Sequence, residues 1–83
     1  MVNMNEKRIL VVEDEPSIAE VVSLYLKRAG FQVQVANDGR QAMSILEKQI
    51  PDFVIMDIML PEVDGPSLTR WLRDRSNVPI IAS

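Results

Sequence analysis

The chain has 83 residues, of which 47% are hydrophobic and 25% charged, and its formal net charge is −3. This length allows one small domain, and the composition is that of a folded globular protein rather than a disordered one. The negative charge argues against a broad nucleic-acid-binding surface.

The sequence contains no cysteine and no histidine. Disulfides, metal sites built on thiolate or imidazole groups, and catalytic triads that need a histidine are therefore excluded. No apolar run is long enough to span a membrane, and residues 1–6 lack the apolar core of a signal peptide. We expect no membrane association and a cytoplasmic location.

The first strand and helix follow each other closely. Residues 8–12 consist of Arg8 and an apolar run of four residues, which predicts a buried strand. Residues 16–29 begin with a proline and then place apolar side chains three and four residues apart, which predicts an amphipathic helix. Asp14 or Glu15 is placed to cap this helix, and Gly30 is a suitable stop.

The middle of the chain predicts a second helix between two different strands. Residues 31–36 alternate between apolar and polar, which indicates a strand with one exposed face at a sheet edge. A turn leads into a helix over residues 39–48. Residues 53–56 are continuously apolar, which predicts a strand buried on both faces, and Asp57 stands at its carboxyl tip.

A third helix is predicted from Pro66 to about residue 76, followed by an apolar strand over residues 78–82. This alternation predicts an α/β fold with a parallel sheet and right-handed crossovers. We expect one domain over residues 7–83, with residues 1–6 a disordered tail. An apolar strand with no helix after it is an unusual end, so we expect the domain to be incomplete at its C-terminus.

Three carboxylates follow two of these strands. If the first and third strands are parallel neighbours, Glu13, Asp14 and Asp57 converge at one edge of the sheet. Carboxylates that lie close together repel one another, and a hard divalent cation, Mg²⁺ or Mn²⁺, relieves the repulsion. An aspartate beside such a cation is suited to accept a phosphoryl group.

These residues also have a plainer interpretation. The acidic run from Glu13 to Glu15 favours the positive end of the following helix. For Glu15 we prefer this interpretation, whereas for Glu13 and Asp14 spacing alone leaves both open. The sulfur of Met59 is expected to pack, but its backbone carbonyl is placed to reach a cation.

Other phosphate and nucleotide motifs are missing. There is no G-x-x-x-x-G-K loop and no G-x-G-x-x-G turn. A small Mg²⁺-dependent phosphatase is a weaker interpretation, because no second aspartate stands two residues after Asp57. Arg70, Arg73 and Arg75 alternate with Asp74 and suggest a solvated helix face rather than a nucleic-acid patch.

Taken together, residues 9–16, 57–61 and 64–65 resemble the receiver domain of bacterial two-component response regulators. With residues 78–81, the details resemble the subfamily that carries a winged-helix DNA-binding output domain. The resemblance implies a flavodoxin-like, three-layer fold with helices on both faces of a parallel sheet of strand order 2-1-3-4. The last strand and helices of that fold would be missing.

The resemblance implies that Asp57 is the phosphoacceptor and takes a phosphoryl group from a sensor histidine kinase. Glu13, Asp14, Asp57 and the Met59 backbone carbonyl would hold Mg²⁺. The domain would assist its own phosphorylation and dephosphorylation and act as a conformational switch, not as a turnover enzyme. Its output would be transcription, with DNA bound only through a domain absent from this chain.

Two departures from the family qualify this expectation. The family has a switch hydroxyl that we expect at the position just after Ser83, so Ser83 can take its place only if the strand register shifts by one. The family's lysine, at the end of the fifth strand, is absent. A rival function is therefore a piece without signalling activity. It would self-associate through the exposed edge of residues 78–82, as a strand-mediated or domain-swapped homodimer.

Overall fold

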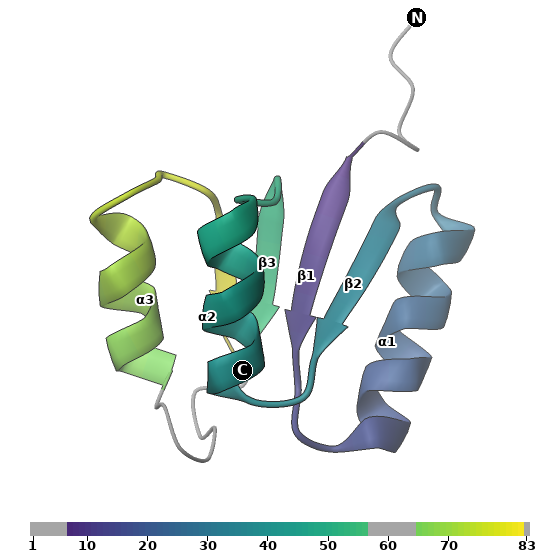
Figure 1. The fold of residues 1–83 in the computed structure, drawn as a ribbon. Helices are drawn as coiled ribbons and strands as arrows, with labels where there is room; N and C mark the ends of the chain where they lie inside the picture. Colours follow the sequence, from purple (N-terminus) through teal and green to yellow (C-terminus); the bar gives the residue numbers. More distant parts are fainter. Residues whose placement is uncertain (1–6, 57–64, 83) are drawn as a thin grey trace, which may run out of the picture.

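The computed structural model describes residues 7–56 and 65–82. In these residues, parallel strands alternate with helices along the chain (Figure 1). The strands are β1 Arg8–Val12, β2 Gln32–Ala36, β3 Phe53–Met56 and β4 Ile80–Ala82. The helices are α1 Pro16–Arg28, α2 Gly39–Lys48 and α3 Gly65–Arg73. The strand order is β2-β1-β3-β4, which confirms the predicted order and places β2 at an edge.

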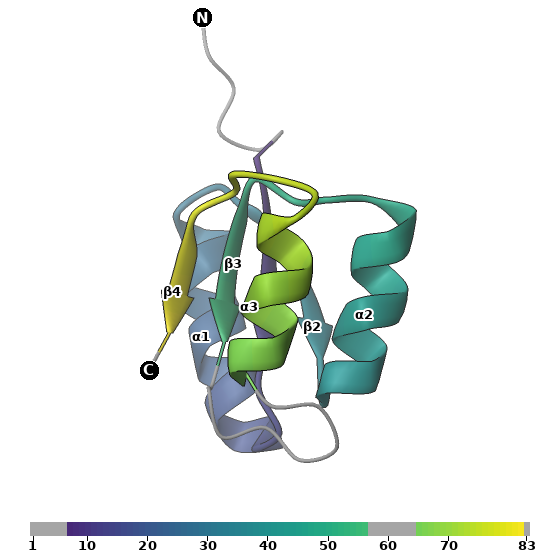
Figure 2. The same cartoon turned by 90° about the vertical axis from the view of Figure 1, so that its left-hand side faces the viewer.

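The sheet lies between two helical layers. Figure 2 shows α2 and α3 on one face of the sheet and α1 on the other. Right-handed crossovers between parallel strands place helices on both faces in this way. The structure therefore confirms the three-layer fold with helices on both faces. Among the described residues, no helix is long and apolar enough to cross a membrane.

The main core fills the space between the sheet and the layer of α2 and α3. Register explains its composition, because Leu10 pairs with Val54 and Val12 pairs with Met56, so these side chains point to the same face. The buried members of the core are Leu10, Val12, Ala36, Ala42, Leu46, Val54, Met56, Leu72 and Val78. The largest fully buried side chains are mostly members of this core: Leu10, Leu46, Met56, Leu72, Val12 and Val54 belong to it, and Val11 does not.

The start of α2 is fixed by its own sequence. Asp38 is the N-cap, and its side chain accepts a hydrogen bond from the backbone N–H of Gln41 at 2.8 Å. The Gln41 side chain in turn accepts a hydrogen bond from the backbone N–H of Asn37 at 2.9 Å. The first bond satisfies a backbone donor that the helix itself leaves open, and the second ties the residue before the N-cap to the first turn of the helix.

Helix α1 differs from its prediction at its cap and in its buried face. Glu15 occupies the N-cap, but its side chain makes no capping hydrogen bond, so neither Glu15 nor Asp14 caps the helix in the predicted way. Only Ala19 and Ser23 of α1 are buried, whereas the apolar Val21 and Tyr25 are 52% and 67% exposed. The helix does end at the predicted glycine, since Gly30 has a φ of 99°.

The last helix and strand are shorter than predicted. Helix α3 ends at Arg73 rather than near residue 76, and β4 begins at Ile80 rather than at Val78. Ser76 explains part of this, because its hydroxyl accepts a hydrogen bond from the backbone N–H of Val78 at 3.1 Å. Pairing with β3 starts only where the Val54 N–H donates to the carbonyl of Pro79, at 3.0 Å.

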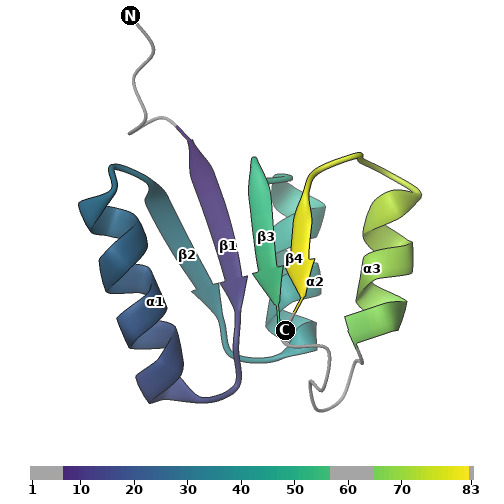
Figure 3. The ribbon, with the colours of Figure 1, turned by 180° about the vertical axis from the view of Figure 1, so that it is seen from behind.

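The α1 face of the sheet is covered unevenly. Ile55 pairs with Ile81, so both side chains lie on the face opposite the main core. Among the described elements, no helix lies in front of β3 and β4 on this face (Figure 3). Ile81 is 58% exposed, and Phe53 and Ile55 are half-buried. The prediction that residues 53–56 are buried on both faces therefore holds fully only on the α2 and α3 side.

Candidate functional site

The carboxyl ends of the strands form the edge where the predicted site lies. The strands point the same way, and α1, α2 and α3 all begin at this edge (Figure 1). Each helix N-terminus carries a partial positive charge, which attracts anions. Electrostatics at this edge therefore suit a ligand that carries phosphoryl oxygens.

Glu13 stands directly at this edge. Its backbone N–H donates to the carbonyl of Ala36 at 3.0 Å, which extends the pairing of β1 and β2 by one step. The side chain is half-buried, and its carboxylate accepts a hydrogen bond from the backbone N–H of Glu15 at 3.2 Å. That bond turns the carboxylate back toward the start of α1 and keeps it at the strand tip.

Asp14 and Glu15 are both exposed, but they differ in their contacts. Glu15 forms the N-cap of α1, and its carboxylate accepts a hydrogen bond from the Ser17 hydroxyl at 3.4 Å. This placement agrees with the interpretation of Glu15 as part of the helix start. Asp14 lies in the bend between Glu13 and that start, on the side of the strand tip.

The structure brings β1 and β3 together as the predicted site requires. The two strands are parallel neighbours, and Val12 pairs with Met56, the last residue of each strand. Asp57 and Met59 lie outside the described residues, as does Ser83. Of the predicted metal ligands the structure therefore places Glu13 and Asp14. No group of three or more acidic or other metal-ligating side chains forms within residues 7–56 and 65–82.

One contact near this edge was missed by sequence reasoning. The hydroxyl of Thr69 in α3 lies 3.7 Å from the sulfur of Met56, at the carboxyl end of β3. This contact links α3 to the strand that leads into Asp57, and it joins residues 13 positions apart. No local pattern in the sequence signals it, because it depends on how α3 packs on the sheet.

The arginines near the end of α3 have structural contacts. The Arg75 guanidinium lies 4.0 Å from the centre of the Trp71 ring and donates to the Trp71 carbonyl at 3.0 Å. Arg73 donates to the carbonyl of Val78 and so fixes the turn before β4. Arg70, Arg73 and Arg75 are all exposed, which agrees with a solvated surface, although Arg75 lies beyond the end of α3.

Comparison with known proteins identifies the family. The model of the response regulator receiver domain matches residues 9–83, and the chain belongs to this family. The DNA-binding response regulator MtrA of Mycolicibacterium smegmatis is 44% identical over 75 residues, which are 90% of this chain and 33% of that protein. The chain thus spans about a third of the length of the curated relatives it matches.

Solved structures agree with the fold and the family. The chemotaxis response regulator CheY4 of Vibrio cholerae superposes with a TM-score of 0.87 at 33% identity, over 92% of this chain and 66% of that one. The response regulator TrrA of Thermotoga maritima, in complex with Mg²⁺ and BeF, has a TM-score of 0.84 at 34% identity, over 92% of this chain and 67% of that one. The fold is therefore the flavodoxin-like receiver fold, the signalling domain of two-component systems.

Proposed function

We propose that this chain accepts a phosphoryl group on Asp57 from the phosphohistidine of a sensor histidine kinase. The observation that carries the proposal is the pairing of Val12 with Met56. Glu13 follows Val12 and Asp57 follows Met56 in the chain, so this pairing brings together the ends of the two strands that lead into these carboxylates. The chain has no histidine, so the phosphohistidine belongs to the partner.

In the proposed transfer, a carboxylate oxygen of Asp57 attacks the phosphorus atom. An O–P bond forms, the P–N bond breaks, and its electron pair stays on the imidazole of the kinase. The N-termini of α1, α2 and α3 face the edge where negative charge gathers. The outcome is a phosphorylated switch that water later resets, so the domain is not a turnover enzyme.

The residues present at this edge fit a hard cation. Glu13 and Asp14 supply carboxylate oxygens, and the sequence contains no cysteine or histidine to offer a thiolate or an imidazole. Oxygen ligands of this kind suit Mg²⁺, with Mn²⁺ as a substitute. We propose that Glu13, Asp14, Asp57 and the Met59 carbonyl hold the ion, which would neutralise charge on the phosphoryl oxygens. The complex of TrrA with Mg²⁺ and BeF supports this assignment by family.

The partners follow from the same family. A cytoplasmic histidine kinase domain would supply the phosphoryl group. DNA would be bound only by a separate output domain; the relative MtrA is a DNA-binding response regulator. We therefore propose that a full-length response regulator with this receiver domain would regulate transcription.

Metal dependence of phosphorylation tests the proposal. The chain is incubated with acetyl phosphate, a small phosphoryl donor, in Mg²⁺ or in EDTA, and its intact mass is recorded. We expect one phosphoryl group per chain in Mg²⁺ and none in EDTA. Equal labelling in both conditions would show that the carboxylates of this edge do not act with a cation.

A second candidate function is self-association without signalling. It is favoured by the exposure of Ile81 at 58%, on a strand that ends the strand order of the described sheet. An edge strand with an exposed apolar side chain is a template for pairing with another chain. Under this proposal the chain forms a homodimer through β4, by strand pairing or by domain swapping.

A further inference from the structure

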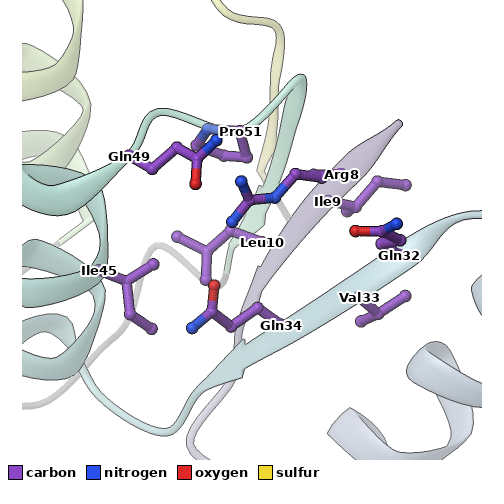
Figure 4. A pocket seen from close by; sticks show the side chains of 9 residues that line it. All are labelled: Arg8, Ile9, Leu10, Gln32, Val33, Gln34, Ile45, Gln49 and Pro51. Carbon is purple, nitrogen blue, oxygen red and sulfur yellow. The ribbon is translucent and has the colours of Figure 1, made fainter. Parts of the chain in front are cut away.

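The end of the sheet opposite the carboxyl edge contains a cavity of about 200 Å³. It lies between the C-terminal part of α2 and the amino-terminal parts of β1 and β2 (Figure 4). The side chains used below are Arg8, Leu10, Gln34, Ile45 and Gln49.

Strand register explains why these side chains meet. Arg8 pairs with Gln32 and Leu10 pairs with Gln34, so all of them point to the face that α2 covers. Helix α2 lies over the carboxyl half of this face, where Ala42 and Leu46 are buried. Toward the amino ends the helix gives way to its C-cap, Gln49, and the sheet is left partly open.

The cavity combines an apolar floor with a cationic wall. Leu10, which is 1% exposed, and the half-buried Ile45 form the floor. Figure 4 shows the Arg8 side chain extending across the cavity toward Gln49, with Gln34 on the other side. Arg8 is half-buried, whereas both glutamines are exposed.

The polar groups of this wall have spare hydrogen-bonding capacity. Arg8 donates its backbone N–H to the carboxylate of Asp52 at 2.8 Å, but within the described residues its guanidinium makes no hydrogen bond or ion pair. The side-chain amides of Gln34 and Gln49 likewise make none within that part of the chain. A guanidinium fork and two amides thus surround one small apolar space.

We propose that this cavity binds a small amphipathic monocarboxylate. The carboxylate pairs with the Arg8 fork, which matches it in geometry and charge. A short apolar group lies on Leu10 and Ile45, and a polar group of the ligand bonds the Gln34 or Gln49 amide. A polyanion is disfavoured, because Arg8 is the one cationic side chain in the lining and the chain carries a net charge of −3.

The test uses N-acetylleucine as the probe and N-acetylleucinamide as its uncharged counterpart. Each is titrated into the isotope-labelled chain, and backbone amide shifts are followed by NMR. We expect saturable shifts at Leu10, Gln34 and Gln49 with the acid. The amide should bind about tenfold or more weakly, as expected for loss of a charge-assisted hydrogen bond.

Two variants separate the site from a general charge effect. Arg8→Gln should abolish the saturable shifts, and Arg28→Gln, which removes an exposed arginine outside the cavity, should leave them unchanged. The proposal is overturned if acid and amide bind equally, or if Arg8→Gln binds like the parent. The comparison of acid with amide on the parent chain decides the matter even if Arg8→Gln fails to fold.

Discussion

Asp14 and Glu15 are consecutive acidic residues with different expected roles. Both are exposed, but Glu15 forms the N-cap of α1, whereas Asp14 lies between it and the strand tip. In the proposed site Asp14 binds the cation and Glu15 does not. The sequence predicts a helix that begins at Pro16 and so assigns Glu15 to the helix start, whereas for Asp14 spacing alone leaves both roles open.

Magnesium should therefore stabilise the parent chain through Asp14. A ligand that binds only the folded state adds about 2.7 kcal/mol at about 100 times its Kd. We expect Mg²⁺ to raise the melting temperature of the parent and of Glu15→Gln, and to leave that of Asp14→Asn nearly unchanged. Thermal unfolding in Mg²⁺ and in EDTA measures this. A full Mg²⁺ response in Asp14→Asn would remove Asp14 from the proposed ligands.

Asp38 makes a separate contribution at the residue scale. Its carboxylate accepts the Gln41 N–H at the start of α2, so Asp38→Ala leaves that donor without its cap. We expect a loss of about 1 kcal/mol in the free energy of unfolding, measured by urea denaturation. Asp74→Ala is the matched control, since Asp74 is exposed and follows the C-terminal end of α3. There a negative charge does not interact favourably with the helix dipole. Equal losses in both variants would contradict the capping role.

Among the elements, α3 joins the core through a single fully buried side chain that the structure describes. Leu72 is 0% exposed and packs in the core cluster. Leu72→Ala should cost about 2–5 kcal/mol, which is a large part of a small domain's stability. Leu24→Ala, at a position 48% exposed in α1, should cost much less. Urea denaturation compares the two, and similar losses would show that α3 is not docked as described.

Elements whose ends are set by local chemistry were predicted well from the sequence. Pro16 begins α1, Gly30 follows its end with a positive φ, and α2 has the predicted bounds. The end of α3 was predicted less well, because the Ser76 hydroxyl and the Arg73 guanidinium bond to Val78 and hold the chain out of the helix. Such bonds depend on tertiary packing and leave no periodic signal.

The buried face of α1 shows a similar limit. Spacing of apolar residues predicts that a helix has an apolar stripe, but not which part of it meets the sheet. Ala19 and Ser23 are buried, while Ile18 and Tyr25 remain 49% and 67% exposed. The buried side chains of α1 are thus two small ones, which the spacing of large apolar residues does not indicate.

At the scale of the whole molecule, the two sheet faces differ. The α2 and α3 face carries the main core, while Ile81 and its neighbours in β3 lie on a face with less cover among the described elements. The strand order and the position of Glu13 agree with the expectation from the sequence. The parts of the site on Asp57 and Met59 lie outside the described residues and stay predictions.

If β4 mediates self-association, Ile81→Lys should weaken it. A charge on this edge disfavours pairing with a second apolar edge. We expect the average molar mass of the parent, measured by light scattering, to rise with protein concentration. The molar mass of Ile81→Lys should stay at that of the monomer. Ile18→Lys, at a position 49% exposed in α1, should associate like the parent. A parent chain that is monomeric at all concentrations would exclude this function.

The central claim is that Asp57 receives the phosphoryl group. The most direct measurement is the intact mass of the parent, Asp57→Asn and Asp52→Asn after incubation with Mg²⁺ and acetyl phosphate. Asp52 lies just before β3 and accepts the backbone N–H of Arg8, a bond that asparagine can also accept, so its variant is the matched control. We predict one phosphoryl group on the parent and on Asp52→Asn and none on Asp57→Asn. A phosphoryl group on Asp57→Asn would contradict the account.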